Sequence, residues 1–239
     1  MAKCSALWNK VSRSVQSAEI LHDELQTALI VPNDTRWNSQ YDAVDKIRHL
    51  ATTAETKFRT VCEKLDLPAF RMNEASFLTE FCSVMKPVAN ALGILQTEKN
   101  CYLGILLPTL ISLRNKVNQV KDQVRYATPL ISAVLDGIES RFGSWFNDEN
   151  LTLATVTLPH FRLRWCINDE CKERARNLLK REMNRISMSA VNKPTATAQS
   201  NEDTDEEFFA FDNTGSDHNN SVQQEMELYL GDEAKQSEV

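Results

Sequence analysis

An arginine followed directly by a tryptophan is the pair in this 239-residue sequence whose side chains are best suited to chemistry. Arg36 and Trp37 combine a cation with a flat aromatic face, the two groups that grip a phosphate and stack on a nucleobase. They follow the turn sequence at 31–34 and open a helical pattern, for which Asp34 is a plausible N-cap. The pair predicts a nucleic-acid contact; the alternative is that Trp37 is an ordinary core tryptophan at a helix start.

A basic stretch later in the chain supplies a second set of candidate phosphate ligands. Arg162 and Arg164 begin it, and acidic residues are interleaved with the cations that come after them. If these cations meet phosphate, binding should weaken steeply with salt. The alternative is a solvated helix face of mixed charge. The further cations are Lys172, Arg174, Arg176, Lys180, Arg181 and Arg185.

Other groups of reactive side chains give weaker patterns. His160, Cys166 and Cys171 supply only three potential zinc ligands, at a spacing that matches no common zinc finger. The aspartates between 34 and 45 fall in the first turns of a predicted helix, where carboxylates stabilise the helix dipole. No nucleophile–base set stands out. We therefore expect no enzymatic activity, no metal, no cofactor and no small-molecule substrate.

Charge is segregated along the chain. Residues 187–239 hold 12 acidic and 2 basic residues, a balance of −10 within the formal total of −6. Residues 1–186 therefore hold the remaining 25 basic and 21 acidic residues, a balance of +4. A mildly basic body with an acidic tail suits weak contact with polyanions, although +4 is a small excess for a DNA-binding domain.

The six cysteines are scattered without a paired framework. We expect free thiols in a reducing compartment, because the first ten residues lack the apolar stretch of a cleavable signal peptide. No run approaches about 18 uninterrupted apolar residues, so we expect no membrane span.

Apolar residues recur at steps of three and four along most of the chain, which predicts a mostly α fold. Pro87 should kink one of the helices, and Thr128 with Pro129 forms a suitable N-cap and N1 pair for another. Residues 151–158 fit either a strand or a helix, and a short helix is expected around 226–230. The longer predicted helices cover 5–27, 35–65 (starting at Thr35 or Arg36), 74–97, 103–121, 128–142 and 169–186.

The remaining aromatic residues divide between expected core positions and the acidic tail. Trp8, Trp145 and Trp165 follow apolar stripes and are expected in the core. Residues 187–224 are polar and acidic, and cannot bury enough apolar area to offset their ordering entropy. Three phenylalanines inside this segment form a candidate docking motif: Phe208, Phe209 and Phe211.

Several short sequence motifs occur along the chain in a fixed order. Asn33-Asp34-Thr35-Arg36-Trp37-Asn38-Ser39 is followed by the runs at 81–89, 92–96, 106–110 and 158–163. Together they resemble the hAT superfamily of DNA transposases, and most closely its BED-finger subgroup. The likeness covers roughly 5–186, and residues 225–230 resemble the start of the family's C-terminal dimerisation segment. Pro159-His160 departs from the Pro-Arg that relatives usually carry.

The resemblance implies an RNase H-like core interrupted by a large helical insertion. On this basis residues 1–147 correspond to the insertion and 148–186 to part of the core. Residues 187–222 would be a disordered acidic linker, and 223–239 the start of the dimerisation segment. The family's two catalytic aspartates, its catalytic glutamate and its BED finger fall outside this sequence, so we expect no nuclease or strand-transfer activity.

One family role maps directly onto the sequence. The tryptophan equivalent to Trp37 stacks near a base flipped out at the transposon end, and such stacking is worth about 1–3 kcal/mol per base. Arg36 would hold a phosphate, and Thr35, Asn38 and Ser39 would fix the turn.

Sequence and resemblance together predict a catalytically inactive, transposase-derived protein of the nucleus. It would contact DNA or chromatin and associate with itself or with related transposase-like proteins. One alternative is a helical protein-interaction module without nucleic-acid contact. The other is a transposon fragment with no selected function.

Overall fold

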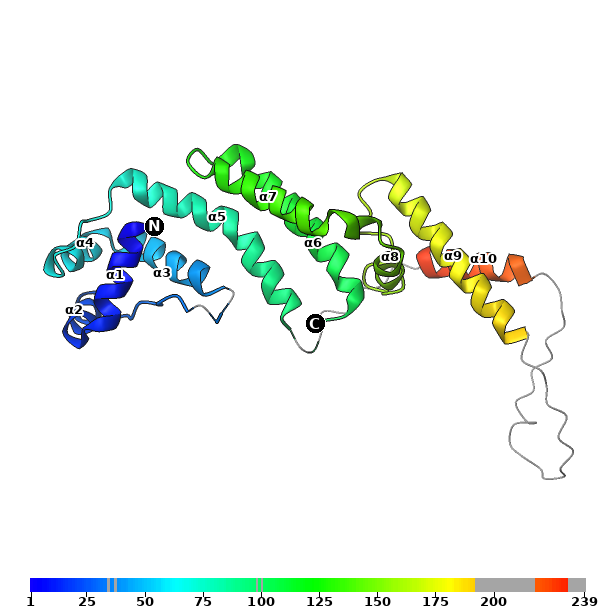
Figure 1. Cartoon of the computed structure of the whole chain (residues 1–239), viewed down its shortest axis with the longest axis horizontal. Helices are drawn as coiled ribbons and strands as arrows, with labels where there is room; N and C mark the ends of the chain where they lie inside the picture. Colours follow the sequence, from blue (N-terminus) through cyan, green and yellow to red (C-terminus); the bar gives the residue numbers. More distant parts are fainter. Residues whose placement is uncertain (34, 37, 98, 100, 192–217, 232–239) are drawn as a thin grey trace, which may run out of the picture. The chain divides into compact units, whose positions relative to one another are not determined.

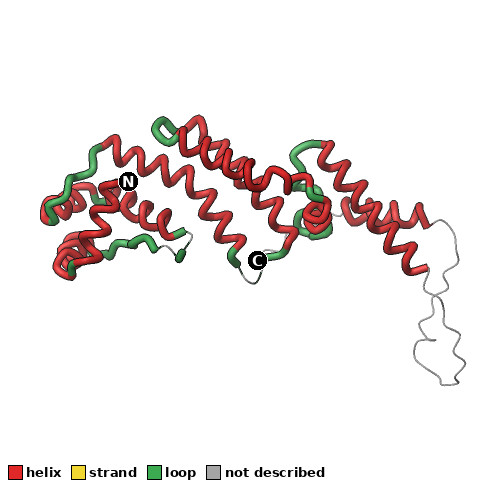
Figure 2. The backbone as a smooth tube through the Cα atoms, in the orientation of Figure 1, coloured by secondary structure: helices red, strands yellow, loops and turns green. Residues whose placement is uncertain are grey.

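The described part of the chain is built from helices. The computed structural model describes residues 1–33, 35, 36, 38–97, 99, 101–191 and 218–231, and these contain α and 3-10 helices but no strand (Figures 1 and 2). The predicted mostly α fold is therefore confirmed. The chain divides into two compact units, Met1–Trp145 and Phe146–Val239.

The first unit begins with two helices where the sequence predicted one. α1 covers Ala2–Arg13 and α2 covers Val15–Leu25. Between them Ser14 takes an extended conformation (φ −139°, ψ 117°), and its Oγ accepts a hydrogen bond from the Ser17 amide at 3.2 Å. The predicted continuous helix is wrong because this N-cap starts a new helix, while the apolar spacing carries on across the break.

The predicted helix over 35–65 is also divided. α3 covers Ser39–Thr53 and α4 covers Glu55–Lys64, separated by Ala54 at φ −130°, ψ 41°. Just before this break, the hydroxyls of Thr52 and Thr53 donate to carbonyls of the preceding turn, and such hydrogen bonds disturb helices. The N-cap residue of α3 is Asn38, whereas the predicted N-cap, Asp34, lies outside the described residues.

Three more α-helices, α5, α6 and α7, belong to this unit. α5 covers Met72–Leu95 and continues through the buried Pro87. The short 3-10 helix η1 (Leu103–Ile105) leads into α6 (Leu106–Val120). A second 3-10 helix, η2 (Lys121–Gln123), precedes α7 (Thr128–Phe142), and η3 (Gly143–Asn147) comes after it.

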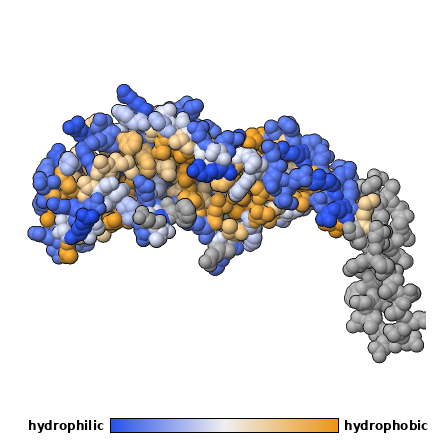
Figure 3. Space-filling model, viewed as in Figure 1, coloured by the Kyte–Doolittle hydropathy of each residue, from blue (hydrophilic) through white to orange (hydrophobic). Residues whose placement is uncertain are grey.

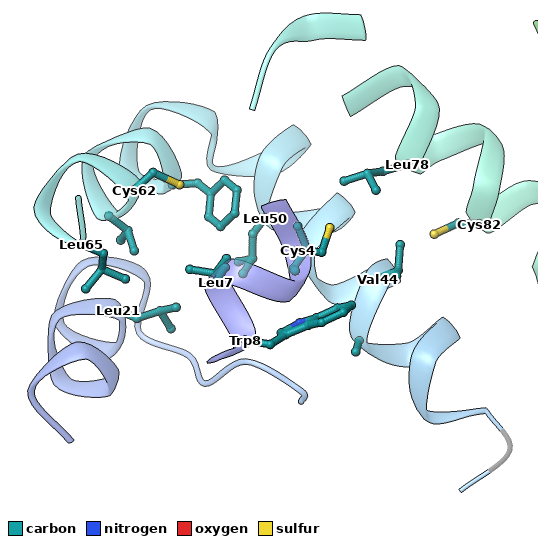
Figure 4. Close-up of a cluster of buried hydrophobic side chains, with 14 residues drawn as sticks. Cys4, Leu7, Trp8, Leu21, Val44, Leu50, Cys62, Leu65, Leu78 and Cys82 are labelled. Carbon is teal, nitrogen blue, oxygen red and sulfur yellow. The ribbon is translucent and has the colours of Figure 1, made fainter. Parts of the chain in front are cut away.

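The first four helices and the start of α5 share one hydrophobic core (Figure 4). Leu7, Leu21 and Ile47 are at most 1% exposed, and burial of each such side chain contributes about 1.5–3 kcal/mol. Trp8 is buried in the same cluster, which confirms its predicted core position. This core holds α3 and α5 in place, and these two helices carry the residues that support the candidate site.

A carboxylate from α5 caps the start of α7. Glu80 accepts hydrogen bonds from the amides of Tyr126 (2.6 Å) and Ala127 (2.9 Å). Burial raises the pKa of Glu80, but the amides of Arg125, Ala127 and Tyr126 outweigh that effect and lower it below the usual range. Thr128 is the first helical residue, so its predicted N-cap role is wrong: the N-cap is Ala127, whose side chain has no acceptor.

The second unit contains three described helices: α8 (Glu149–Val156), α9 (Asp169–Val191) and α10 (His218–Gly231). The ambiguous segment 151–158 is therefore mainly helical. Its start is fixed by Asp148, whose Oδ1 accepts from the Leu151 amide at 2.9 Å. α9 and α10 extend into the segment predicted as a linker, and the rest of it, including the three phenylalanines, lies outside the described residues.

Apolar side chains reach the surface in several places (Figure 3). Trp165 is buried as predicted, but Trp145 is 39% exposed and packs edge-on against Phe142 at 5.0 Å between ring centroids, so its predicted core position is wrong.

No described helix combines the length and the apolar character needed to cross a membrane.

Candidate nucleic-acid interface

Asn33 organises the turn that carries Arg36. Its Oδ1 accepts from both the amide and the hydroxyl of Thr35, each at 2.9 Å. Its backbone carbonyl accepts from the Arg36 amide at 3.2 Å and from Ser39 Oγ at 2.5 Å. Hydrogen bonds of this kind between an asparagine side chain and the residue two positions later are typical of Asx turns. Thr35 and Ser39 therefore both bond to Asn33, and their supporting role stays a prediction.

The far end of the turn is tied to a different helix. Asn38 Nδ2 donates to the carbonyl of Ala89 in α5 at 3.0 Å. The next residue, Ser39, is 7% exposed, and Ala43 and Val44 on the same helix are fully buried. The hydrogen bond and the buried face together anchor the turn to the α3–α5 pair, so Asn38 also has a supporting position.

Arg36 is exposed on this anchored turn. Its backbone bonds at both ends, because its amide donates to Asn33 and its carbonyl accepts from the Ser39 amide at 3.0 Å. Its side chain is therefore presented to solvent from a constrained backbone, as a phosphate ligand must be. Trp37 lies outside the described residues, so its stacking role stays a prediction.

Arg162 has a packing role in the second unit. The residue is 8% exposed and takes a left-handed conformation (φ 47°). Its guanidinium carbon lies 5.0 Å from the centroid of the Tyr229 ring of α10, and its carbonyl accepts from Trp165 Nε1 at 2.7 Å. Because a phosphate contact needs an exposed guanidinium, we withdraw Arg162 from the candidate interface. Arg164 is exposed and stays in it as a prediction.

Many of the α9 cations bond to protein groups. Arg181 pairs with Glu149 at 2.6 Å, which raises the pKa of Arg181 and lowers that of Glu149. Arg174 donates to Asn147 Oδ1 at 2.7 Å. Three more pairs run along the helix surface: Lys172 with Asp169, Arg176 with Glu173, and Arg185 with Glu182. This arrangement matches the alternative of a solvated helix face.

The sulfur-containing residues do not assemble a metal centre in the described part of the chain. No group of three or more His, Cys, Asp or Glu side chains there could hold an ion. Burial, and then a hydrogen bond with the Cys171 thiol, raise the pKa of Cys166 to about 12.

Sequence reasoning missed a second place where cations and aromatic rings meet. Phe70-Arg71 and Arg125-Tyr126 are adjacent aromatic–cation pairs of the same type as Arg36-Trp37. The structure brings Phe70 and Tyr126 to one pocket, together with Phe77. The repeated aromatic–cation pairs could have been recognised in the sequence, but their grouping in one pocket depends on how the helices pack.

No protein-family model matches the chain, and no significant match is found among characterised proteins or solved structures. The likeness to hAT transposases therefore rests on the short motifs alone. Any role that the chain would share with those transposases is accordingly a proposal.

Proposed function

We propose that this protein is a non-catalytic, transposase-derived protein that contacts DNA in the nucleus. The observation that carries the proposal is the anchored turn around Arg36. The turn is fixed internally by Asn33 and externally by the bond from Asn38 to α5. It presents an exposed cation directly before Trp37. A constrained cation next to an aromatic residue is suited to hold a phosphate while a base stacks beside it.

The domain assignment belongs to the same proposal. We assign 1–147 to the helical insertion of a hAT-like protein and 148–186 to part of an RNase H-like core, whose helices would include α8 and α9. Residues 223–239 would begin a dimerisation segment that includes most of α10. The order of the motifs along the chain supports this assignment.

Fluorescence anisotropy of the full chain with labelled DNA tests the proposal. The two probes are a blunt duplex and the same duplex ending in an unpaired base, each measured across a salt series. We expect salt-sensitive binding with preference for the unpaired end. Trp37→Ala should weaken binding to that end about fivefold or more while affecting the blunt duplex less. Arg36→Ala should weaken binding to both probes, and Lys57→Ala, at an exposed position on α4, is its control for loss of charge. Equal, salt-insensitive signals for both probes would refute the proposal.

A second candidate function, protein association, is favoured by exposed apolar residues in the second unit. Ile186 and Met188 of α9 and Leu228 of α10 are 62%, 72% and 73% exposed. Exposed large apolar side chains are candidates for association surfaces. Sedimentation velocity over a concentration series tests this candidate: association should be weakened by Leu228→Gln. A monomer at all concentrations would exclude self-association.

A further inference from the structure

A pocket with aromatic walls lies beside the start of α5 in the first unit. Its volume is about 450 Å³, within the usual range for small-ligand sites, and three of its lining residues are Phe70, Phe77 and Tyr126. The walls come from the beginning of α1, the beginning of α5 and the loop before α7, which Figure 1 shows at neighbouring ends. The pocket is formed by segments far apart in the sequence.

Two of the three rings are supported from behind. Phe70 packs against Phe58 with 5.6 Å between ring centroids, and Phe58 is only 3% exposed. The ring centroid of Phe77 lies 6.5 Å from that of Phe81 on the same helix. Rings backed in this way lose little conformational freedom when a flat ligand stacks on them, because packing already restricts their rotamers.

The third ring, Tyr126, is 43% exposed and stands on a fixed backbone. Its amide donates to Glu80 at 2.6 Å, which holds the residue against α5. The guanidinium carbon of Arg125 lies 5.5 Å from the centroid of the Tyr126 ring. The exposed residue of the pocket therefore already combines a cation with an aromatic face.

The charges around the pocket favour an anionic ligand. Glu74 accepts from Lys3 Nζ at 2.6 Å and from the Arg71 amide at 2.7 Å. Glu80 accepts from two backbone amides, so both carboxylates are engaged by groups of the protein itself. Arg71 and Arg125 are exposed and form no ion pair with a described carboxylate. Two exposed cations are therefore adjacent in sequence to the lining residues Phe70 and Tyr126, while the nearby carboxylates are held in hydrogen bonds.

We propose that this pocket binds single-stranded nucleic acid by stacking an unpaired base among Phe70, Phe77 and Tyr126, with Arg71 and Arg125 contacting the flanking phosphates. Aromatic faces with nearby cations are the means by which proteins hold single strands without reading sequence. The inference rests on the proposed function for its class of partner, nucleic acid. It names a contact separate from the Arg36 turn.

Anisotropy of the full chain with a labelled oligothymidine of about 12 nucleotides tests this pocket. Tyr126→Ala should weaken binding about fivefold or more, whereas Tyr126→Phe, which keeps the stacking face, should bind like the wild type. Tyr102→Ala is the matched control, because Tyr102 is 58% exposed in the same unit and does not line the pocket. An abasic strand of equal length should bind more weakly to the wild type and be insensitive to Tyr126→Ala.

Three results would overturn the proposal. Equal binding of the abasic and thymidine strands would assign the contact to charge alone. Full binding by Tyr126→Ala would place the strand elsewhere. Binding of a phenylalanine-containing acidic peptide without binding of the strand would assign the pocket to a protein partner. Trp37→Ala separates this site from the proposed function, since it should lower the preference for an unpaired duplex end and leave the Tyr126 effect unchanged.

Discussion

Removing the carboxylate of Glu80 should loosen the start of α7 without unfolding the unit. Glu80→Ala deletes the acceptor for the amides of Tyr126 and Ala127. Loss of a helix cap costs about 0.5–2 kcal/mol, and because Glu80 is only half-buried we expect about 1 kcal/mol. This corresponds to an equilibrium constant for local opening of the start of α7 that is about fivefold larger.

Hydrogen exchange localises this effect. The amides of Leu130 and Ile131 bond to the Ala127 carbonyl in the first turn of α7, so their protection factors should fall about fivefold. Glu80→Gln keeps a neutral acceptor and should cost about half as much. Glu63→Ala is the control, because the Glu63 side chain is 67% exposed and its Oε1 lies 3.9 Å from Arg59 Nε, an exposed ion pair that contributes little to stability. Unchanged protection in Glu80→Ala would refute the capping role.

The same bond predicts a pH dependence. The pKa of Glu80 is lower in the folded state than its ordinary value of 4.5, so the carboxylate contributes its full stabilisation above that unfolded value. The contribution is lost as pH falls through the folded pKa. Wild type and Glu80→Gln should therefore differ at neutral pH and converge in acid. A difference that persists after Glu80 is protonated would contradict this explanation.

Single contacts support three more predictions. Ser14→Ala removes the N-cap of α2 and should lower the free energy of unfolding by about 1 kcal/mol in urea titrations; no change would contradict the cap. Burial, and after it the charge of Asp45, raises the pKa of the Cys82 thiol to about 12. A maleimide at neutral pH should therefore label the exposed Cys101 well before the buried Cys82, and peptide mass spectrometry would show the order of labelling. Asn38→Ala should speed exchange of the Ser39 amide about fivefold by releasing the turn from α5, and unaltered exchange would argue against that anchor.

The sequence predicts helices better than their breaks. Leu7, Val44 and Ile47 belong to apolar stripes that the pattern identifies and the structure buries. The breaks at Ser14 and Ala54 were missed because each interrupts the backbone at one residue and leaves the apolar spacing nearly intact. A periodic pattern reports which face is buried, not whether the backbone is continuous along it.

Long-range contacts account for the other differences. The cap of α7 comes from Glu80, 46 residues before Tyr126, so no local motif around Thr128 could reveal it. Arg162 is in contact with Tyr229, a residue of a helix that begins 56 positions later in the chain at His218. For the candidate site, the local part of the turn around Arg36 could be predicted, while the anchor from Asn38 to Ala89 depends on how α3 packs on α5.

The central claim, contact between the Arg36 turn and an unpaired DNA base, is tested most directly by photo-crosslinking. A duplex carrying 5-iodouracil as its unpaired end base would be irradiated with the full chain, and the crosslinked residue identified by mass spectrometry. We predict a crosslink at Trp37 that is lost at high salt and is weakened by Arg36→Ala. Crosslinks that fall only outside residues 33–39, or that form equally with a paired base at that position, would contradict this claim.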